Sequence, residues 1–180
     1  GVAVVGSGRI GTLRAVMASR HPAVNFVAVS DREPAKAEKL AAQCGAQFWS
    51  GDNLEVISRP EVDAVVVSTI ELEHVQPVVQ ALEMGKKVFV EKPIALKLAD
   101  ADLLIDTARR HADRGATLHV GFSRRFKKRY MIAKEQLRRG RLGALTGAVV
   151  RLFNTRSQAM QTLSRLPENS PTSGLTYYID

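Results

Sequence analysis

The sequence predicts an α/β fold in which a doubly wound parallel sheet is followed by the start of a second α/β domain. Short valine-rich runs alternate with amphipathic helical patterns over the first 120 residues. The runs are apolar at consecutive positions, as in strands that helices cover on both faces. The first run ends in the glycine-rich turn GSGRIG. Repeated strand–helix–strand units join parallel strands by right-handed crossovers, so this alternation indicates a doubly wound parallel sheet.

Short strands form the predicted sheet. They are VAVV at 2–5, FVAVS at 26–30, VDAVVVS at 62–68, VFVE at 88–91 and TLHVGF at 117–122. Ligands of an open parallel sheet bind beyond the carboxyl ends of its strands. The residues that follow each run are therefore the first candidates for a site.

Helices are expected between these strands, at 10–20, 34–44, 74–84 and 99–111. In the first helix, Leu13, Val16 and Met17 fall on one side. Pro34 begins the second helix and Gly45 ends it, since proline suits the first turn and glycine suits the position after the last.

The pattern changes near residue 120, where we place a domain boundary. Residues 1–120 form the predicted sheet domain. Residues 121–180 begin a second, incomplete domain, because roughly 60 residues are few for an independent core. A basic helix is expected at about 127–139 and a more polar strand at about 144–154. The chain starts inside a strand and stops at Asp180 in the apolar stretch LTYYID, so we expect it to be part of a longer protein.

Charge and composition limit the classes of function. Of the net charge of +8, residues 120–180 contribute the excess, with 12 Lys or Arg against 3 Asp or Glu, whereas residues 1–119 carry 14 against 15. The stretches RRFKKR and RRGR form no interleaved aromatic platform and match no recognised nucleic-acid motif, so we interpret them as an exposed basic helix and expect no nucleic-acid partner. Neither a membrane span nor a signal peptide is indicated, which makes a cytoplasmic location the expectation.

Neither a metal site nor a disulfide is indicated. The single cysteine, Cys44, precedes Gly45 in a helical pattern and is expected to be a buried structural thiol. His21, His111 and His119 have no partners at metal-ligand spacing, and we interpret them as structural or exposed.

The turn after the first strand predicts a phosphate-binding loop. Gly6 permits the tight turn, Gly8 lets a pyrophosphate approach the backbone, and Gly11 lets the helix lie close to the strand. The helix that begins there offers unpaired N–H groups and the positive end of its dipole to phosphates. A glycine turn without a ligand is the alternative. The predicted cofactor-binding residues of this loop are Gly6, Ser7, Gly8, Arg9, Ile10 and Gly11.

Asp31 and Arg32 follow the second strand and bear on the choice of cofactor. Asp31 lies roughly 20 residues after the turn, where a carboxylate meets the ribose hydroxyls of a dinucleotide. A carboxylate repels the 2′-phosphate of NADP, so NAD is the expected preference. The guanidinium of Arg32 could stack on adenine or pair with that phosphate, so we expect NADP to be tolerated. An exposed arginine in a turn is an equally good interpretation of Arg32.

Two further strand ends lie at the same predicted edge of the sheet. Ser68, Thr69 and Ile70 follow one run, and Glu91, Lys92 and Pro93 end and follow the next. A lysine at this edge faces the same crevice as GSGRIG. Because the bond precedes a proline, a cis Lys92–Pro93 peptide would be allowed and would aim the lysine inward.

Four motifs together resemble a known family. GSGRIG, VSTIELEH, ALEMGKKVFVEKPIAL and VGFSRRF occur in the order and spacing of the glucose-fructose oxidoreductase, inositol dehydrogenase and rhizopine-catabolism (Gfo/Idh/MocA) family. The resemblance implies a Rossmann domain followed by a domain with an open, mostly antiparallel sheet. It also implies NAD(P)-linked hydride transfer to or from a secondary alcohol of a sugar, cyclitol or related polyol, and homo-oligomers formed through that second sheet.

The resemblance assigns roles to residues of this chain. It makes Lys92 a catalytic and substrate-orienting lysine and places Glu91, Ser68, Thr69 and His74 around the nicotinamide half of the cofactor. Lys92 and Ile70 are also predicted to bind the cofactor. Ile70 stands where the family usually has proline, which slightly alters that loop. Arg124 resembles an arginine near the substrate. Asp180 is the candidate for the aspartate of an Asp-x-x-x-His pair, whose histidine would lie beyond the last residue.

Other interpretations stay open at this point. Lys92 would otherwise be a surface lysine, and His74 suits helix capping or exposure as well as cofactor contact. A cofactor-binding regulator without turnover, or a glycosidase that recycles bound NAD, would have the same fold. The sequence does not name the substrate.

Overall fold

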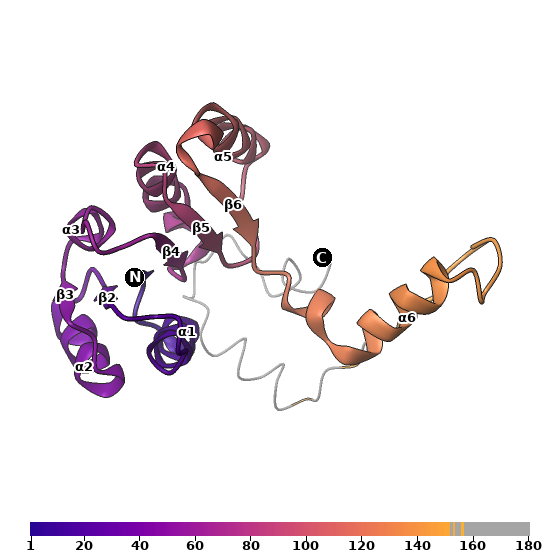
Figure 1. Ribbon diagram of the computed structural model, residues 1–180, viewed down its shortest axis with the longest axis horizontal. Helices are drawn as coiled ribbons and strands as arrows, with labels where there is room; N and C mark the ends of the chain where they lie inside the picture. Colours follow the sequence, from indigo (N-terminus) through magenta and orange to yellow (C-terminus); the bar gives the residue numbers. More distant parts are fainter. Residues whose placement is uncertain (152, 154–155, 157–180) are drawn as a thin grey trace. The chain divides into compact units, whose positions relative to one another are not determined.

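The computed structural model describes residues 1–151, 153 and 156, and it shows the predicted parallel sheet (Figure 1). Six strands pair in parallel in the order β3-β2-β1-β4-β5-β6. The strands are β1 (Val2–Val5), β2 (Val27–Ser30), β3 (Phe48–Ser50), β4 (Ala64–Val67), β5 (Lys87–Val90) and β6 (Thr117–Val120). The order reverses between β1 and β4, and this switch point is where an open parallel sheet binds ligands.

Helices cover both faces of the sheet, because alternate strand residues pack in two separate cores. Val4 packs with Ala15 and Leu40 under α1 (Arg9–Ser19) and α2 (Pro34–Cys44). Val5 packs with Leu82 in the opposite core. That core lies under α3 (Asn53–Ile57), α4 (Val75–Glu83) and α5 (Leu98–Arg110) (Figure 1). The alternation follows from the period of two in a strand.

Two elements were not anticipated and one helix face differs from expectation. Strand β3 and helix α3 are only 3 and 5 residues long, too short for a periodic pattern to reveal them. In α1 the sheet-facing residues are Gly11 and Ala15, whereas Leu13 and Met17 are 51% and 56% exposed. Small residues face the sheet because α1 lies very close to β1.

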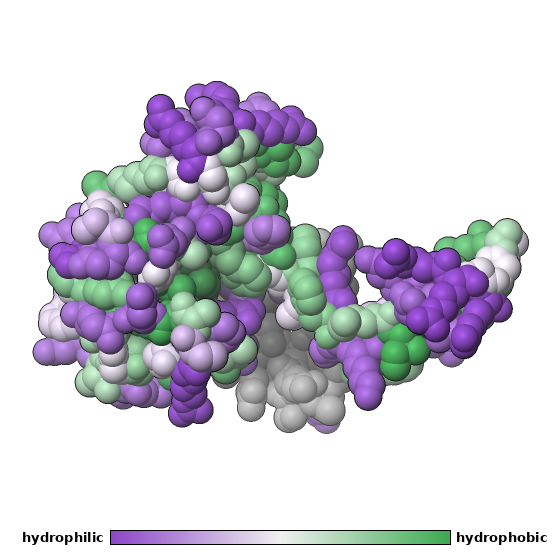
Figure 2. All heavy atoms as spheres, in the orientation of Figure 1, coloured by the Kyte–Doolittle hydropathy of each residue, from purple (hydrophilic) through white to green (hydrophobic). Residues whose placement is uncertain are grey.

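The second part of the chain departs from the predicted strand. Contacts divide the chain into Gly1–Tyr130 and Met131–Asp180. Helix α6 (Lys128–Arg138) confirms the expected basic helix, and its residues in Figure 2 are mainly hydrophilic. The strand expected at about 144–154 is wrong for the described residues 144–151, which have no regular secondary structure and are exposed. A strand forms only against a partner, and no described residue pairs with this segment.

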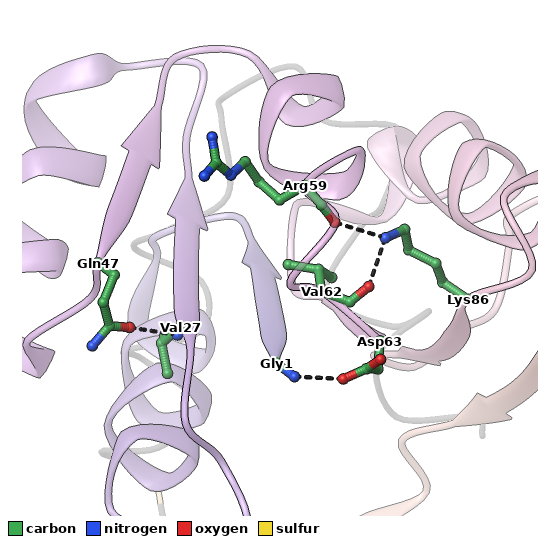
Figure 3. Close-up of polar contacts among 7 residues, drawn as sticks. All are labelled: Gly1, Val27, Gln47, Arg59, Val62, Asp63 and Lys86. Carbon is green, nitrogen blue, oxygen red and sulfur yellow. Dashed lines mark hydrogen bonds and ion pairs between the residues drawn. The ribbon is translucent and has the colours of Figure 1, made fainter.

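A partly buried lysine lies at the edge of the sheet opposite the carboxyl strand ends. Lys86 Nζ donates to the carbonyl oxygens of Arg59 at 3.0 Å and Val62 at 2.6 Å (Figure 3). Burial lowers the pKa of Lys86, although Asp63 and Glu61 oppose this shift. The lysine therefore joins the loop before β4 to the loop before β5.

We expect Lys86→Met to lower the free energy of unfolding by about 1–3 kcal/mol, because two carbonyl groups lose a charged donor. The matched control is Lys87→Met, which removes an exposed lysine at the next position. It should change stability by less than about 0.5 kcal/mol. Urea unfolding of both variants would measure the difference, and equal stabilities would show that the Lys86 contacts contribute nothing.

Candidate functional site

The turn between β1 and α1 leaves no room for side chains at two of its glycines. Gly6 has a φ of +94°, and a Cβ there would lie 2.8 Å from the backbone of Ser68 and Thr69. A Cβ at Gly11 would lie 1.7 Å from the carbonyl oxygen of Gly6. The ends of β1 and β4 and the first turn of α1 therefore meet backbone to backbone, as the glycine spacing predicted.

Gly8 differs from the other two glycines because the space beside it is open. It is the N-cap of α1 with an ordinary φ of −71°, and a Cβ there would meet nothing within 4 Å. No side chain caps α1, and its first turn carries no acidic residue. The first N–H groups of α1 have no intrahelical partner, and Arg9 and Gly8 are exposed beside them. This uncapped helix end fits a phosphate group.

Asp31 is attached to the same turn. Its Oδ2 accepts a hydrogen bond from the Ser7 backbone N–H at 2.8 Å, and its Oδ1 accepts one from the Glu33 N–H at 3.0 Å. Ser7 Oγ donates to the Ser30 carbonyl oxygen at 3.1 Å. The carboxylate is thus held beside the glycine turn, and each oxygen keeps a lone pair for a ribose hydroxyl. Arg32 follows it and is exposed.

A polar network that sequence reasoning missed supports the Asp31 side of the site. Ser30 Oγ donates to Asn53 Oδ1 at 2.9 Å, and Ser50 Oγ donates to the Glu55 carboxylate. Ser30 and Ser50 are buried. A serine that ends a valine-rich strand could have suggested such a network, but its partners come from β3 and α3, which the sequence pattern did not reveal.

Three residues after β4 lie under and beside the glycine turn. Ser68 is 8% exposed, and its N–H donates to the Val5 carbonyl oxygen at 2.8 Å. Ser68 Oγ and Thr69 Oγ1 are buried without a hydrogen-bond partner among the described residues. Ile70 is half exposed. Two orphaned hydroxyls at a strand end suit a polar ligand, since buried polar groups are otherwise paired.

His74 is connected to the EKP loop. The imidazole is 1% exposed, and its Nδ1 lies 2.9 Å from the carbonyl oxygen of Pro93. His74 follows η1 (Glu71–Glu73) and precedes α4, and its side chain makes no capping hydrogen bond. The imidazole is therefore neither exposed nor a side-chain cap of α4, and it is buried against the EKP loop.

The EKP loop contains the candidate catalytic lysine and an ion pair. Glu91 Oε1 accepts hydrogen bonds from Arg14 Nε at 2.9 Å and Nη2 at 2.5 Å. The Arg14 and Glu91 side chains are 25% and 17% exposed. Lys92 is exposed, and the Lys92–Pro93 bond is cis. Arg14 was missed, although position 14 lies three residues after Gly11 on the sheet-facing side of α1, where a cation requires a partner.

Two further candidates come from the later part of the chain. Arg124 is exposed in η3 (Ser123–Phe126), which begins three residues after the end of β6. Asp180 lies outside the described residues. Across residues 1–151, 153 and 156, no group of three or more His, Cys, Asp or Glu could hold a metal ion. No helix in the same residues is long and apolar enough to cross a membrane.

The comparisons with known proteins agree on one family. The model of the oxidoreductase family with an NAD-binding Rossmann fold, GFO_IDH_MocA, matches residues 1–122. The chain is 34% identical over 142 residues to scyllo-inositol 2-dehydrogenase (NAD(+)) from Bacillus subtilis, covering 78% of this chain and 41% of that protein. It is 34% identical over 140 residues to inositol 2-dehydrogenase from Rhizobium meliloti, with 78% and 41% coverage.

A solved structure with ligands is also similar. Scyllo-inositol dehydrogenase from Lactobacillus casei, with bound NAD(H) and scyllo-inositol, superposes with a TM-score of 0.74 at 27% identity. The match covers 81% of this chain and 42% of that one. This chain therefore spans about two fifths of the length of these relatives.

The glycines generate a prediction that separates folding from binding. Gly8→Ala should change the free energy of unfolding by less than about 1 kcal/mol, since its φ suits any residue and its Cβ meets nothing. It should weaken NAD binding at least about tenfold, because a pyrophosphate must approach that backbone. Gly11→Ala should unfold the domain or cost more than about 3 kcal/mol.

Calorimetric titration with NAD measures binding by the 180-residue chain, and urea unfolding measures the stability of the same chain. Gly147→Ala is the control, since Gly147 is an exposed glycine outside the turn and its Cβ would meet nothing within 4 Å. Unweakened NAD binding by a folded Gly8→Ala chain would contradict the phosphate-binding role of the turn.

Proposed function

The chain belongs to the Gfo/Idh/MocA oxidoreductase family with an NAD-binding Rossmann fold, and on this premise we propose that it supplies the cofactor site of an NAD-dependent dehydrogenase. The proposed reaction moves a hydride between nicotinamide and a secondary alcohol of an inositol or a related polyol or sugar. The relatives described above are inositol dehydrogenases, and the Lactobacillus casei enzyme holds NAD(H) with scyllo-inositol.

The observation that carries the proposal is the arrangement around Gly8. An uncapped helix end opens onto free space there, and Asp31 is held within one residue of it by the Ser7 N–H. Ser7 cannot give the same N–H to a phosphate, so the following N–H groups of α1 take that role. A phosphate on α1 and a ribose on Asp31 together match a dinucleotide better than a lone phosphate ester.

The chain's own residues would perform three tasks. The α1 N-terminus binds the pyrophosphate, and Asp31 accepts hydrogen bonds from the adenosine ribose. Lys92 donates a hydrogen bond to the substrate hydroxyl and stabilises the negative charge that develops on its oxygen. Asp180 orients a histidine that accepts the hydroxyl proton. NAD, when bound by these residues, would supply the hydride chemistry.

Cofactor preference depends on Asp31. Asp31→Asn removes the charge and keeps one oxygen for the Ser7 N–H, so the contact with the turn should stay, while the Glu33 N–H, at an exposed residue, loses its acceptor. We expect NAD affinity to fall about tenfold, as for the loss of one charge-assisted hydrogen bond. NADP affinity should fall less or rise, since the repulsion of the 2′-phosphate is gone. Calorimetric titrations with both cofactors measure this, with Arg32→Gln as the matched variant that weakens NADP alone.

Catalysis depends on Lys92. In the protein as its gene encodes it, Lys92→Met should lower kcat for inositol oxidation by about a hundredfold or more, because the oxyanion loses its donor. NAD affinity should change by less than about threefold, since phosphate and ribose contacts stay. NADH absorbance with a panel of inositols and sugars reports turnover. Lys97→Met, at an exposed lysine before α5, is the control. Binding of NAD without turnover of any polyol by the unaltered protein would indicate a regulator instead.

A further inference from the structure

Lys92 lies between two hydrogen-bonded anchors that come from opposite faces of the sheet. On the α1 side, the Arg14 guanidinium binds the carboxylate of Glu91, the residue before Lys92. The same guanidinium lies 5.1 Å from the centre of the Phe89 ring. Gly121 lies close to this ion pair, because a Cβ there would come within 3.1 Å of Glu91 Oε2. Glu91 is therefore held by the charge of Arg14, which itself lies over a ring, and it packs against the residue that follows β6.

On the α4 side, His74 binds the residue after Lys92. A carbonyl oxygen only accepts hydrogen bonds, so Nδ1 of His74 carries the proton that it donates to Pro93. The imidazole is buried at 1% exposure, and the next residue, Ile94, packs against the core under α4 and α5. Glu91 and Ile94, three residues apart, therefore contact elements on opposite faces of the sheet.

We infer that Arg14 and His74 are positioning residues for Lys92, an inference that rests on the proposed function. Neither side chain needs to touch the substrate. Arg14 belongs to the helix whose N-terminus would hold the pyrophosphate, so its bond to Glu91 sets the distance between the bound cofactor and the lysine. His74 fixes the other end of the same loop. Misplacement of a catalytic group by about 1 Å can cost a hundredfold in rate.

A purely structural role makes a different prediction from a positioning role. Loss of a structural contact would lower stability or NAD affinity and would lower turnover whether or not Lys92 is present. Loss of a positioning contact should lower kcat through Lys92 alone. The test therefore needs the double variants with Lys92→Met, because residues that act through one another are not additive.

The experiment compares two variants that remove a hydrogen-bond donor with two conservative variants that keep one, in the protein as its gene encodes it. Arg14→Met and His74→Phe remove the donors. Arg14→Lys keeps a cation for Glu91, and His74→Asn keeps an N–H near the position of Nδ1. The control is Arg20→Met, an exposed arginine at the end of the same helix. For each variant we would measure kcat and KM with an inositol, the dissociation constant for NAD, and the thermal midpoint of unfolding.

We expect Arg14→Met and His74→Phe each to lower kcat about 10- to 100-fold, with NAD affinity within about threefold of the unaltered protein. Arg14→Lys and His74→Asn should recover at least part of the lost rate. When Lys92→Met is already present, adding Arg14→Met or His74→Phe should change the residual turnover by less than about twofold. Unchanged kcat, or an equal loss in that background, would overturn the inference. Absence of turnover in the unaltered protein would instead overturn the proposed function, and the positioning role with it.

Discussion

The backbone contact between the β1–α1 turn and the end of β4 determines where the rest of the site lies. Gly11 approaches Gly6 so closely that even a methyl group would overlap its carbonyl oxygen, and Gly6 in turn abuts Ser68. The contact places the N-terminus of α1 over the switch point of the sheet, next to Asp31. It also explains why α1 turns Gly11 and Ala15 toward the sheet and leaves Leu13 and Met17 exposed. Larger residues would push the helix away.

The second feature that organises the site is the contact of the EKP loop with elements on both faces of the sheet. Glu91 binds Arg14 of α1, and Ile94 packs against the core on the other face. A charged side chain at the end of a buried strand would be costly alone, because a partly buried carboxylate needs a partner. The ion pair with Arg14 removes that cost and joins the phosphate-binding helix to the loop of the candidate catalytic lysine.

Much of the fold could be predicted, and the failures have physical reasons. Pro34 and Gly45 bound α2 as their backbone preferences require, with Gly45 left-handed at a φ of +69°. The valine-rich runs formed the central strands β1, β2, β4 and β5. Strand β3 is a short edge strand that pairs with β2 alone among the described residues. Its three residues are too few to show a periodic pattern, so pairing with β2 rather than its own sequence defines it. The strand expected at 144–154 failed for the described residues 144–151 for the same reason, since no partner is present among the described residues.

By itself the sequence determined the parallel sheet, the glycine turn and the strand ends at which Asp31, Ser68 and Lys92 occur, because spacing along the chain and backbone freedom are local properties. Only the tertiary structure decided which side chains meet. Arg14 and Glu91 are 77 residues apart, and His74 and Pro93 are 19 apart. Such pairs depend on the order of strands and on the helix that lies over each face, which no local pattern records. The sequence therefore located the candidate lysine, and the fold showed what holds it in place.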